Sequence, residues 1–115
     1  EGLYEPVESR EFRLKILAED FRSAGAAVLD SLAEYAKEQP GWSIAPDNCE
    51  GVRVNLDKAH GDGWFLLRLS LHDPILPLNI ESDREHGART IARQLAPFLA
   101  QQVNIDASSA LEFTL

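Results

Sequence analysis

The sequence predicts an α+β fold in which two amphipathic helices pack on one face of a mostly antiparallel sheet. Three observations lead to this prediction. The segments follow the order strand, helix, several strands, helix. The strand segments alternate apolar and polar residues with a period of two, and the two helical segments repeat apolar residues every three to four positions. Because the helices cover one face, the opposite face of the sheet is left open for binding.

The composition is that of one globular domain. The chain has 115 residues, of which 44% are hydrophobic and 26% charged, and no low-complexity tract divides it. We expect a single domain over residues 1–115, with residues 1–10 as a linker and residues 103–115 as a tail. The formal net charge of −8 argues against the basic surface that nucleic acids and anionic membranes require. With no bilayer-spanning apolar run and no signal peptide, a cytoplasmic protein is expected.

The first expected strand and helix occupy the N-terminal third of the chain. Residues 11–17 alternate apolar and charged side chains, which is typical of a half-buried strand. Ser23 is a candidate N-cap for a helix that stops before Pro40 and Gly41. The core-facing positions of this helix are Val28, Leu29, Leu32, Tyr35 and Ala36.

Further strands follow in the middle of the chain. Residues 42–44 predict a short strand and residues 52–57 a longer, alternating one. Residues 64–71 are mostly apolar, which favours a central strand that buries Phe65, Leu67, Leu69 and Leu71 on one face. In the next strand, residues 75–81, Pro77 lacks the N–H of a ladder bond and so predicts an edge position or a bulge.

The second helix is expected to begin at about Asp83. Ser82 and Glu85 have the spacing of a capping box, in which a hydroxyl and a carboxylate satisfy the first amides of a helix. Pro97 predicts a kink or an early end. The tail alternates only weakly, so an extra strand and a disordered end are both left open. The apolar stripe of this helix comprises Ala88, Ile91, Ala92, Leu95, Phe98 and Leu99.

Two polar stretches resemble functional motifs but favour a structural interpretation. Residues 60–63 place one carboxylate, Asp62, between glycines, which favours a hairpin turn over a metal loop. His72 and Asp73 are adjacent, so in an extended chain they point to opposite faces. A catalytic dyad would therefore require a turn, which Pro74 permits.

Two further residues are assigned no role. His86 is expected on the solvent side of the second helix. Cys49 is the single cysteine, with no Cys or His at ligand spacing beside it, so we expect neither a disulfide nor a metal site there.

Arg68 and Ser70 form the candidate binding site. The period of a strand puts the guanidinium and the hydroxyl on one face, and residues 71–73 beyond them can offer backbone N–H groups to the same anion. A guanidinium suits phosphate because its planar fork donates two parallel hydrogen bonds. The alternative is that Arg68 pairs with a carboxylate across the sheet.

The same region carries a family resemblance. "EGVRVNL" followed by "DGWFLLRLSLHDPILPLNIES" resembles the C-terminal domain of the α-D-phosphohexomutases, the family of phosphomannomutases and phosphoglucomutases. In that family, a strand like D-G-V-R-V precedes a Trp-containing strand that ends in R-x-S-N-T-E-P or R-x-S-G-T-E-P. Matching residues here include Trp64, Arg68, Ser70 and Pro74. "SREFRL", from Ser9, is similar to the S-G-E-I-N segment that opens the same domain, so the resemblance spans residues 9–99.

The resemblance implies a fold and a function. The fold would be a four-stranded antiparallel sheet with two helices, in the TATA-binding-protein-like arrangement. The domain would close over the active site of an isomerase that interconverts hexose 1-phosphate and hexose 6-phosphate, and would grip the phosphate that is not transferred. Arg68 and Ser70 would bind this phosphate, with the backbone amides near Leu71 and His72 completing the cradle.

The resemblance also implies what this domain leaves to the rest of the enzyme. The phosphoserine that carries the transferred group and the loop that binds Mg²⁺ would lie in upstream domains of the same chain. No catalytic residue, metal or cofactor is expected in this domain alone. Mg²⁺ and a hexose 1,6-bisphosphate activator are implied for the full-length enzyme, and the expected partners are a hexose phosphate and the upstream domains.

The binding loop departs from the family pattern. Leu71 replaces a small or amide residue, His72 replaces Thr and Asp73 replaces Glu, while Pro77 stands where the family often has Arg. A lost donor to a charged group costs roughly 1.5–3 kcal/mol, or about tenfold or more in binding, unless His72 donates instead. We expect an altered but working clamp. The alternative is a non-catalytic interaction or regulatory domain that kept the fold and lost the clamp.

Overall fold

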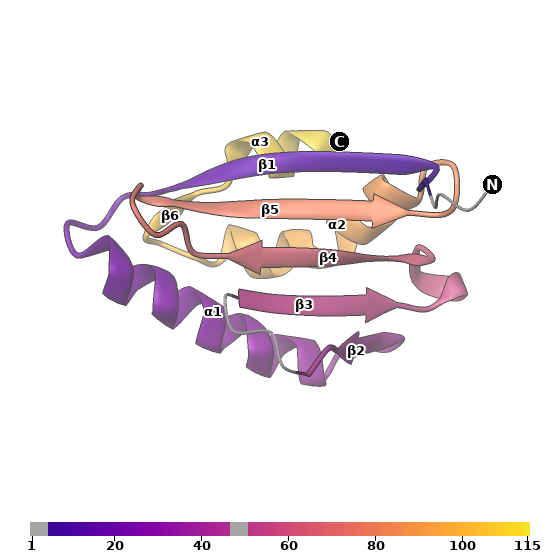
Figure 1. Ribbon diagram of the computed structural model, residues 1–115, viewed down its shortest axis with the longest axis horizontal. Coiled ribbons are helices and arrows are strands. Elements are labelled where there is room, and N and C mark those ends of the chain that lie inside the picture. Colours follow the sequence, from indigo (N-terminus) through magenta and orange to yellow (C-terminus); the bar gives the residue numbers. More distant parts are fainter. Residues whose placement is uncertain (1–4, 47–50) are drawn as a thin grey trace.

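The computed structural model describes residues 5–46 and 51–115, which form one six-stranded antiparallel sheet and three α-helices (Figure 1). The strand order is β2-β3-β4-β5-β1-β6, and every neighbouring pair is antiparallel. The predicted α+β class is confirmed. Cys49 lies outside the described residues.

In chain order the elements are β1 (Glu8–Ile16), α1 (Phe21–Lys37), β2 (Trp42–Ile44), β3 (Gly51–Leu56), the 3-10 helix η1 (Lys58–His60), β4 (Gly63–Arg68), β5 (Ile75–Ser82), α2 (Gly87–Ala100), β6 (Ile105–Asp106) and α3 (Ser108–Phe113).

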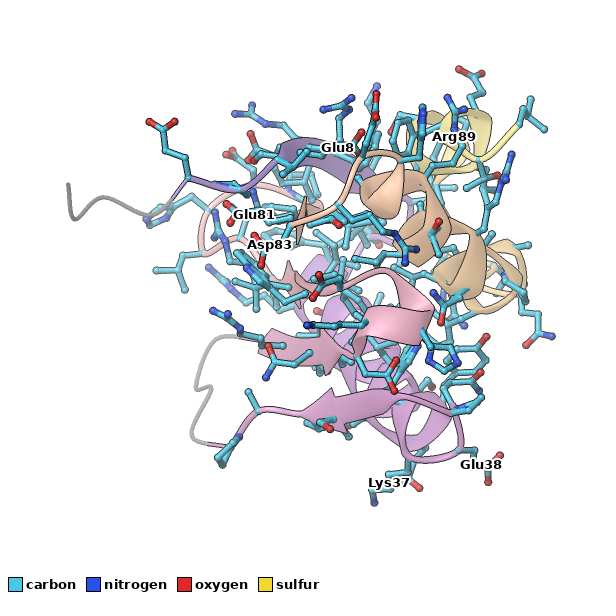
Figure 2. The ribbon with its side chains drawn as sticks, turned by 90° about the vertical axis from the view of Figure 1, so that its right-hand side faces the viewer. Glu8, Lys37, Glu38, Glu81, Asp83 and Arg89 are labelled. Carbon is cyan, nitrogen blue, oxygen red and sulfur yellow. The ribbon has the colours of Figure 1, made fainter. Side chains whose placement is uncertain are left out.

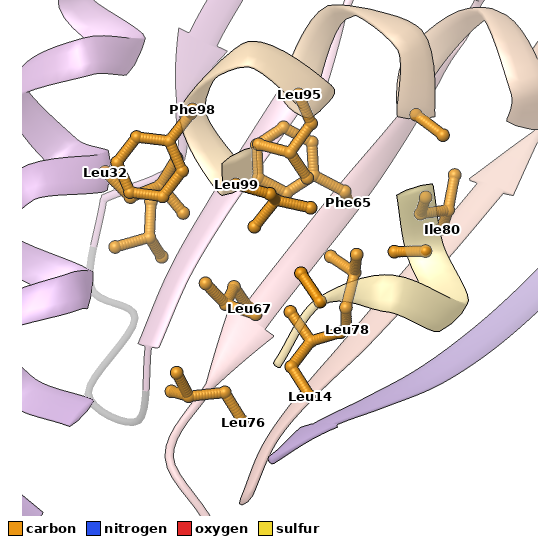
Figure 3. Close-up of a cluster of buried hydrophobic side chains, with 14 of the residues drawn as sticks. Leu14, Leu32, Phe65, Leu67, Leu76, Leu78, Ile80, Leu95, Phe98 and Leu99 are labelled. Atoms are coloured by element: carbon orange, nitrogen blue, oxygen red, sulfur yellow. The ribbon is translucent and has the colours of Figure 1, made fainter. Parts of the chain in front are cut away.

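The helices lie behind the sheet in Figure 1, and the end-on view of Figure 2 shows α2 and α3 on one side of it. The core between the two layers is apolar, and each large side chain buried there contributes about 1.5–3 kcal/mol before entropic costs. None of the described helices covers the opposite face of the sheet, as predicted (Figures 1 and 2). Fully buried core side chains, several of them drawn in Figure 3, include Leu14, Leu32, Phe65, Leu67, Leu76, Leu78, Ile80 and Leu95.

The expected count of four strands and two helices is wrong. The short strand β2 extends one edge of the sheet by pairing with β3. At the other edge Ile105 of β6 pairs with Ile16 of β1, and α3 follows. The tail folds because it has apolar surface to bury: Ala110 is buried, and the Phe113 ring packs on Phe12 with centroids 5.4 Å apart. The tail is therefore part of the domain.

The N-terminal elements begin earlier than predicted. β1 begins at Glu8, so residues 8–10 belong to the sheet and not to a linker. The N-cap of α1 is Asp20, whose carboxylate accepts a hydrogen bond from the amide of Ser23 at 3.2 Å. Ser23 itself therefore lies inside the helix. No described helix combines the length and apolar composition that crossing a lipid bilayer requires.

Ser82 is the last residue of β5, so the predicted capping box does not form. Its side chain is fully buried, donates a hydrogen bond to the carbonyl of Gly61 at 2.6 Å and accepts one from the amide of Arg84 at 3.1 Å. The hydroxyl thus ties the end of β5 to the β3–β4 connection. Helix α2 begins five residues later, at Gly87.

A residue far away in the sequence caps α2. The Glu8 carboxylate accepts hydrogen bonds from the amides of His86 at 2.8 Å and Ala88 at 3.0 Å. His86 is exposed to solvent, as expected, but it precedes the helix, with φ 66°, and does not lie within it. Of the two outcomes predicted for Pro97, a kink or an early end, the early end is wrong, because the helix continues to Ala100.

Pro77 lies in a central strand, between β4 and β1, so the predicted edge position is wrong. The Ile75 carbonyl accepts from the amide of Ser70 on the β4 side. Because alternate residues direct their backbone groups to opposite neighbours, Pro77 also faces β4. The paired register ends at Leu67 and Leu78, and extending it by one residue places Pro77 opposite Arg68. The missing N–H falls where the β4–β5 pairing ends, and the strand therefore tolerates the proline.

Candidate functional site

Arg68 ends β4 on the open face of the sheet. Its neighbour Leu67 is fully buried under the helices, so strand alternation directs the half-buried Arg68 side chain away from them. Its guanidinium makes no ion pair or hydrogen bond with any residue in the described ranges 5–46 and 51–115. The alternative in which Arg68 pairs with a carboxylate across the sheet therefore finds no support among these residues.

The loop of residues 69–74 follows Arg68 and joins β4 to β5. The Ser70 hydroxyl accepts a hydrogen bond from the amide of Asp73 at 3.3 Å, which leaves its own proton available. The amides of Leu71 and His72 donate to no described residue. Arg22 of α1 donates to the Leu71 carbonyl at 2.9 Å and so fixes the loop on the helix. Two amides and one hydroxyl proton that bond to no described residue thus lie within four residues of Arg68.

The Leu71 side chain is 74% exposed, so its predicted burial is wrong. β4 ends at Arg68, so Leu71 lies three residues beyond the strand, in the loop, where strand alternation no longer fixes its side. Leu69 still packs on the core, near Gly25 of α1. His72 and Asp73 are both exposed and have no side-chain contact with each other, so the described loop contains no dyad.

Sequence reasoning missed Arg13 of β1. Arg13 pairs in register with Pro77, and the β4–β5 register, extended one residue beyond its last pair of Leu67 and Leu78, places Arg68 on the other side of Pro77. The three residues therefore form one row across the open face. The available signal was the alternation of residues 11–17, which placed Arg13 on the exposed side without saying which strand would lie beside it.

A second cationic side chain on the open face has an aromatic partner. The Arg53 guanidinium of β3 stacks over the Trp64 ring of β4, with 4.1 Å to the ring centroid. Such contacts occupy a guanidinium and are worth about 0.5–2 kcal/mol. Arg53 is therefore held in place, unlike Arg13 and Arg68.

A cavity of about 490 Å³ opens beside the loop, between α1 and the ends of β3 and β4. The described part of its lining is mostly apolar and includes Asp30 of α1 and Arg68 at the end of β4. The polar groups that could hold an anion lie on the loop.

The 60–63 stretch is a turn, as predicted. Lys58–His60 form η1, Gly61 and Asp62 have positive φ, and the His60 ring contacts the Asp57 carboxylate. The Gln94 amide donates to the His60 carbonyl at 2.6 Å and holds the turn against α2. No group of three or more metal-ligating side chains was found among the described residues.

A second cavity, of about 560 Å³, lies between this turn and the two long helices. The Tyr35 hydroxyl donates to the Gln94 carbonyl at 3.0 Å and the Trp42 ring nitrogen donates to the Gln94 side chain at 3.0 Å. Burial raises the pKa of Tyr35. These polar groups are used in joining α1, β2 and α2, which indicates a structural role.

Comparison with known proteins adds no family assignment. A scan against protein-family models gave no match, and a search of curated proteins gave no significant one. The family resemblance therefore depends on the motif residues quoted from the sequence.

Proposed function

We propose that this chain is the C-terminal substrate-phosphate-binding domain of a phosphomannomutase or phosphoglucomutase, an isomerase that moves phosphate between the C1 and C6 hydroxyls of a hexose. The observation that carries the proposal is the uncommitted Arg68 guanidinium at the end of β4, beside a loop whose amides at Leu71 and His72 are free among the described residues. The choice of this family rests on the sequence motif around Arg68 and Ser70.

The chemistry required is anion binding. A phosphate oxygen accepts readily from a guanidinium, from a hydroxyl and from backbone N–H groups, and the charged acceptor strengthens each bond. Arg68 supplies the charge, Ser70 a hydroxyl proton, and the loop its amides. His72 is exposed on the same loop and can donate in place of the Thr hydroxyl that the family pattern has.

The domain would act as a lid. Holding the phosphate that is not transferred lets the domain close over the sugar and reopen while the bond-making steps take place in the upstream domains. Mg²⁺ and the hexose 1,6-bisphosphate would be bound there, in a cytoplasmic enzyme.

Titration with hexose phosphates tests the proposal. Glucose 6-phosphate or mannose 6-phosphate added to ¹⁵N-labelled chain should shift the amide signals of residues 68–73 at millimolar concentration, since one phosphate on an acidic domain binds no tighter than about −4 kcal/mol. Arg68→Ala should abolish the shifts. Arg84→Ala is the matched control, because Arg84 is an exposed arginine that donates to the Lys58 carbonyl, in the β3–β4 connection beyond the far end of β4.

A second candidate follows from the exposed Leu71. An apolar side chain at a loop tip suits contact with another protein better than contact with a sugar phosphate. The chain would then be a non-catalytic interaction or regulatory domain. Signals of residues 68–73 that stay unmoved up to 50 mM hexose phosphate, on the order of fifty times the expected dissociation constant, would favour this candidate.

A further inference from the structure

We infer that Arg13 and Arg68 hold one phosphate group between them, above the ring of Pro77. The inference rests on the proposed function and adds to it a ligand from another strand, at the opposite end of the sequence. It makes Arg13 a specificity-determining residue of the phosphate site.

The register of three strands places the two arginines. Arg13 lies opposite Pro77 in the β1–β5 pairing. On the β4 side the last pair is Leu67 with Leu78, and the Ser70 amide donates to the Ile75 carbonyl beyond it, so the register continues and places Arg68 opposite Pro77. The Cα atoms of the two arginines are thus two strand spacings apart, about 10 Å, and both side chains rise from the open face. Between them stands only the short, rigid ring of Pro77. Two long guanidinium side chains that flank a small residue can converge on one anion above it.

The two arginines share a second property. Of the eight arginines, all in the described ranges, Arg13 and Arg68 are the two without a hydrogen bond, ion pair or aromatic contact to another described residue. The other six each donate to a carbonyl or stack on a ring.

Acidic residues outnumber basic residues in this chain. It carries 19 acidic residues and 11 basic ones, so partners for two arginines are available. Glu11 lies two residues before Arg13 on the same face of β1, yet forms no ion pair with it in the described structure. Lys15, by contrast, lies opposite Asp106 of β6. Two unpaired guanidinium groups in one row repel each other, and a dianion between them would relieve the repulsion.

The remaining donors lie in the next row. Ser70 faces Ile75 of β5, which pairs in turn with Lys15 of β1. A phosphate above Pro77 would thus receive guanidinium groups from both sides and the Ser70 hydroxyl from the loop. A dianionic phosphate matches this arrangement better than a singly charged carboxylate, because each guanidinium can take its own pair of oxygens.

The test follows the arginine side chains directly. Inorganic phosphate is titrated into the ¹⁵N-labelled chain at constant pH and ionic strength, and the Nε–Hε signals of Arg13 and Arg68 are monitored. Both should shift along the same saturation curve. Arg13→Gln should weaken phosphate binding about tenfold or more, the loss expected for a charge-assisted contact, while Arg13→Lys should lose less because it keeps the charge.

Arg10→Gln is the matched control, from the same strand. Arg10 sits three residues before Arg13 but beside the Phe113 ring, on the helix side of the sheet, and should leave phosphate binding unchanged. If Arg68→Gln abolishes binding while Arg13→Gln behaves like Arg10→Gln, the role of Arg13 is wrong and the proposed function stands. If the unaltered chain binds neither phosphate nor hexose phosphate, both are wrong.

Discussion

The two ends of the sheet treat polar groups in opposite ways. Figure 2 shows the end of the sheet where β5 finishes and α2 begins. There the side chains of Ser82 and Glu8 form hydrogen bonds with backbone groups of the protein. At the other end, where β4 finishes, Arg68, Arg13 and the amide of His72 find no partner among the described residues. The polar groups at one end are paired within the protein, and those at the other end have no partner among the described residues.

The difference separates stability from binding. Buried polar groups are normally paired, and breaking such a pair costs about 1–3 kcal/mol. Exposed polar groups that stay unpaired cost little, because water solvates them, and they remain available for a ligand. Substitutions at the Ser82 end should therefore lower the free energy of unfolding, while substitutions at the Arg68 end should lower affinity for phosphate.

Gly87→Ala should give the largest effect. A Cβ on Gly87 would overlap the Ser82 hydroxyl and lie 2.7 Å from the carbonyl oxygen of Gly61, where neither atom can move freely. We expect a loss of about 1–3 kcal/mol or more in the free energy of unfolding, measured by urea denaturation.

Gly25→Ala is the matched substitution near the loop end. There the Cβ would meet the tip of the Leu69 side chain at 2.6 Å, which can turn aside, and alanine favours the helix by about 1 kcal/mol. Gly25→Ala should be neutral or stabilising. Equal losses from both substitutions would show that the two ends do not differ in rigidity.

The same serine substitution at both ends should produce opposite results. Ser82→Ala removes a buried donor and leaves the Gly61 carbonyl and the Arg84 amide without their partner, so unfolding should become easier by about 1–3 kcal/mol. Ser70→Ala removes only a partly exposed acceptor for the Asp73 amide. It should change stability by less than about 0.5 kcal/mol and weaken phosphate binding instead.

Each serine variant is measured for both properties, by denaturation and by phosphate titration. A Ser70 variant that unfolds as easily as the Ser82 variant, or one that binds phosphate normally, would remove Ser70 from the site.

The sequence predicted the elements that local patterns define. Alternation placed residues 42–44 in a strand and residues 52–57 almost wholly in one, and helical periodicity found both long helices. It failed where a contact distant in sequence decides the outcome. Ser82 and Glu85 have capping-box spacing, but the Ser82 hydroxyl donates its hydrogen bond to the Gly61 carbonyl, and the Glu8 carboxylate caps the helix. No local pattern contains these partners.

The candidate site divides in the same way. Arg68 and Ser70 were available to sequence reasoning, because they lie two residues apart on one strand. Arg13 was not, because only the pairing of β1 with β5 brings it beside Pro77. The exposure of Leu71 was missed for a related reason. The proline that ends the β4–β5 pairing acts from the opposite strand, and the alternation of residues 64–71 does not reveal it.

The smallest effect concerns the charge on Glu8. Burial would raise the pKa of this carboxyl, but the amides of His86 and Ala88 and the charge of Arg10 outweigh it and hold the pKa below its ordinary value of 4.5. A depressed pKa means that the ionised carboxylate stabilises the fold above pH 4.5, and that this stabilisation is lost as pH falls through the lower, folded-state pKa. Glu8→Gln should cost about 0.5–1 kcal/mol at pH 7.

The difference between Glu8→Gln and the unaltered chain should persist down to about pH 4.5, the ordinary value for glutamate, and vanish in stronger acid. Glu11→Gln, on the same strand but on the open face, should show no such dependence, because Glu11 caps no helix. Glutamine keeps one side-chain oxygen but replaces the other with an NH₂ donor, so the substitution removes the charge and one of the two hydrogen bonds, and only the pH-dependent part of the difference reports the charge. A difference in the free energy of unfolding that stays constant at all pH values would mean that Glu8 stabilises the fold through its hydrogen bonds to the helix amides and that its charge contributes nothing.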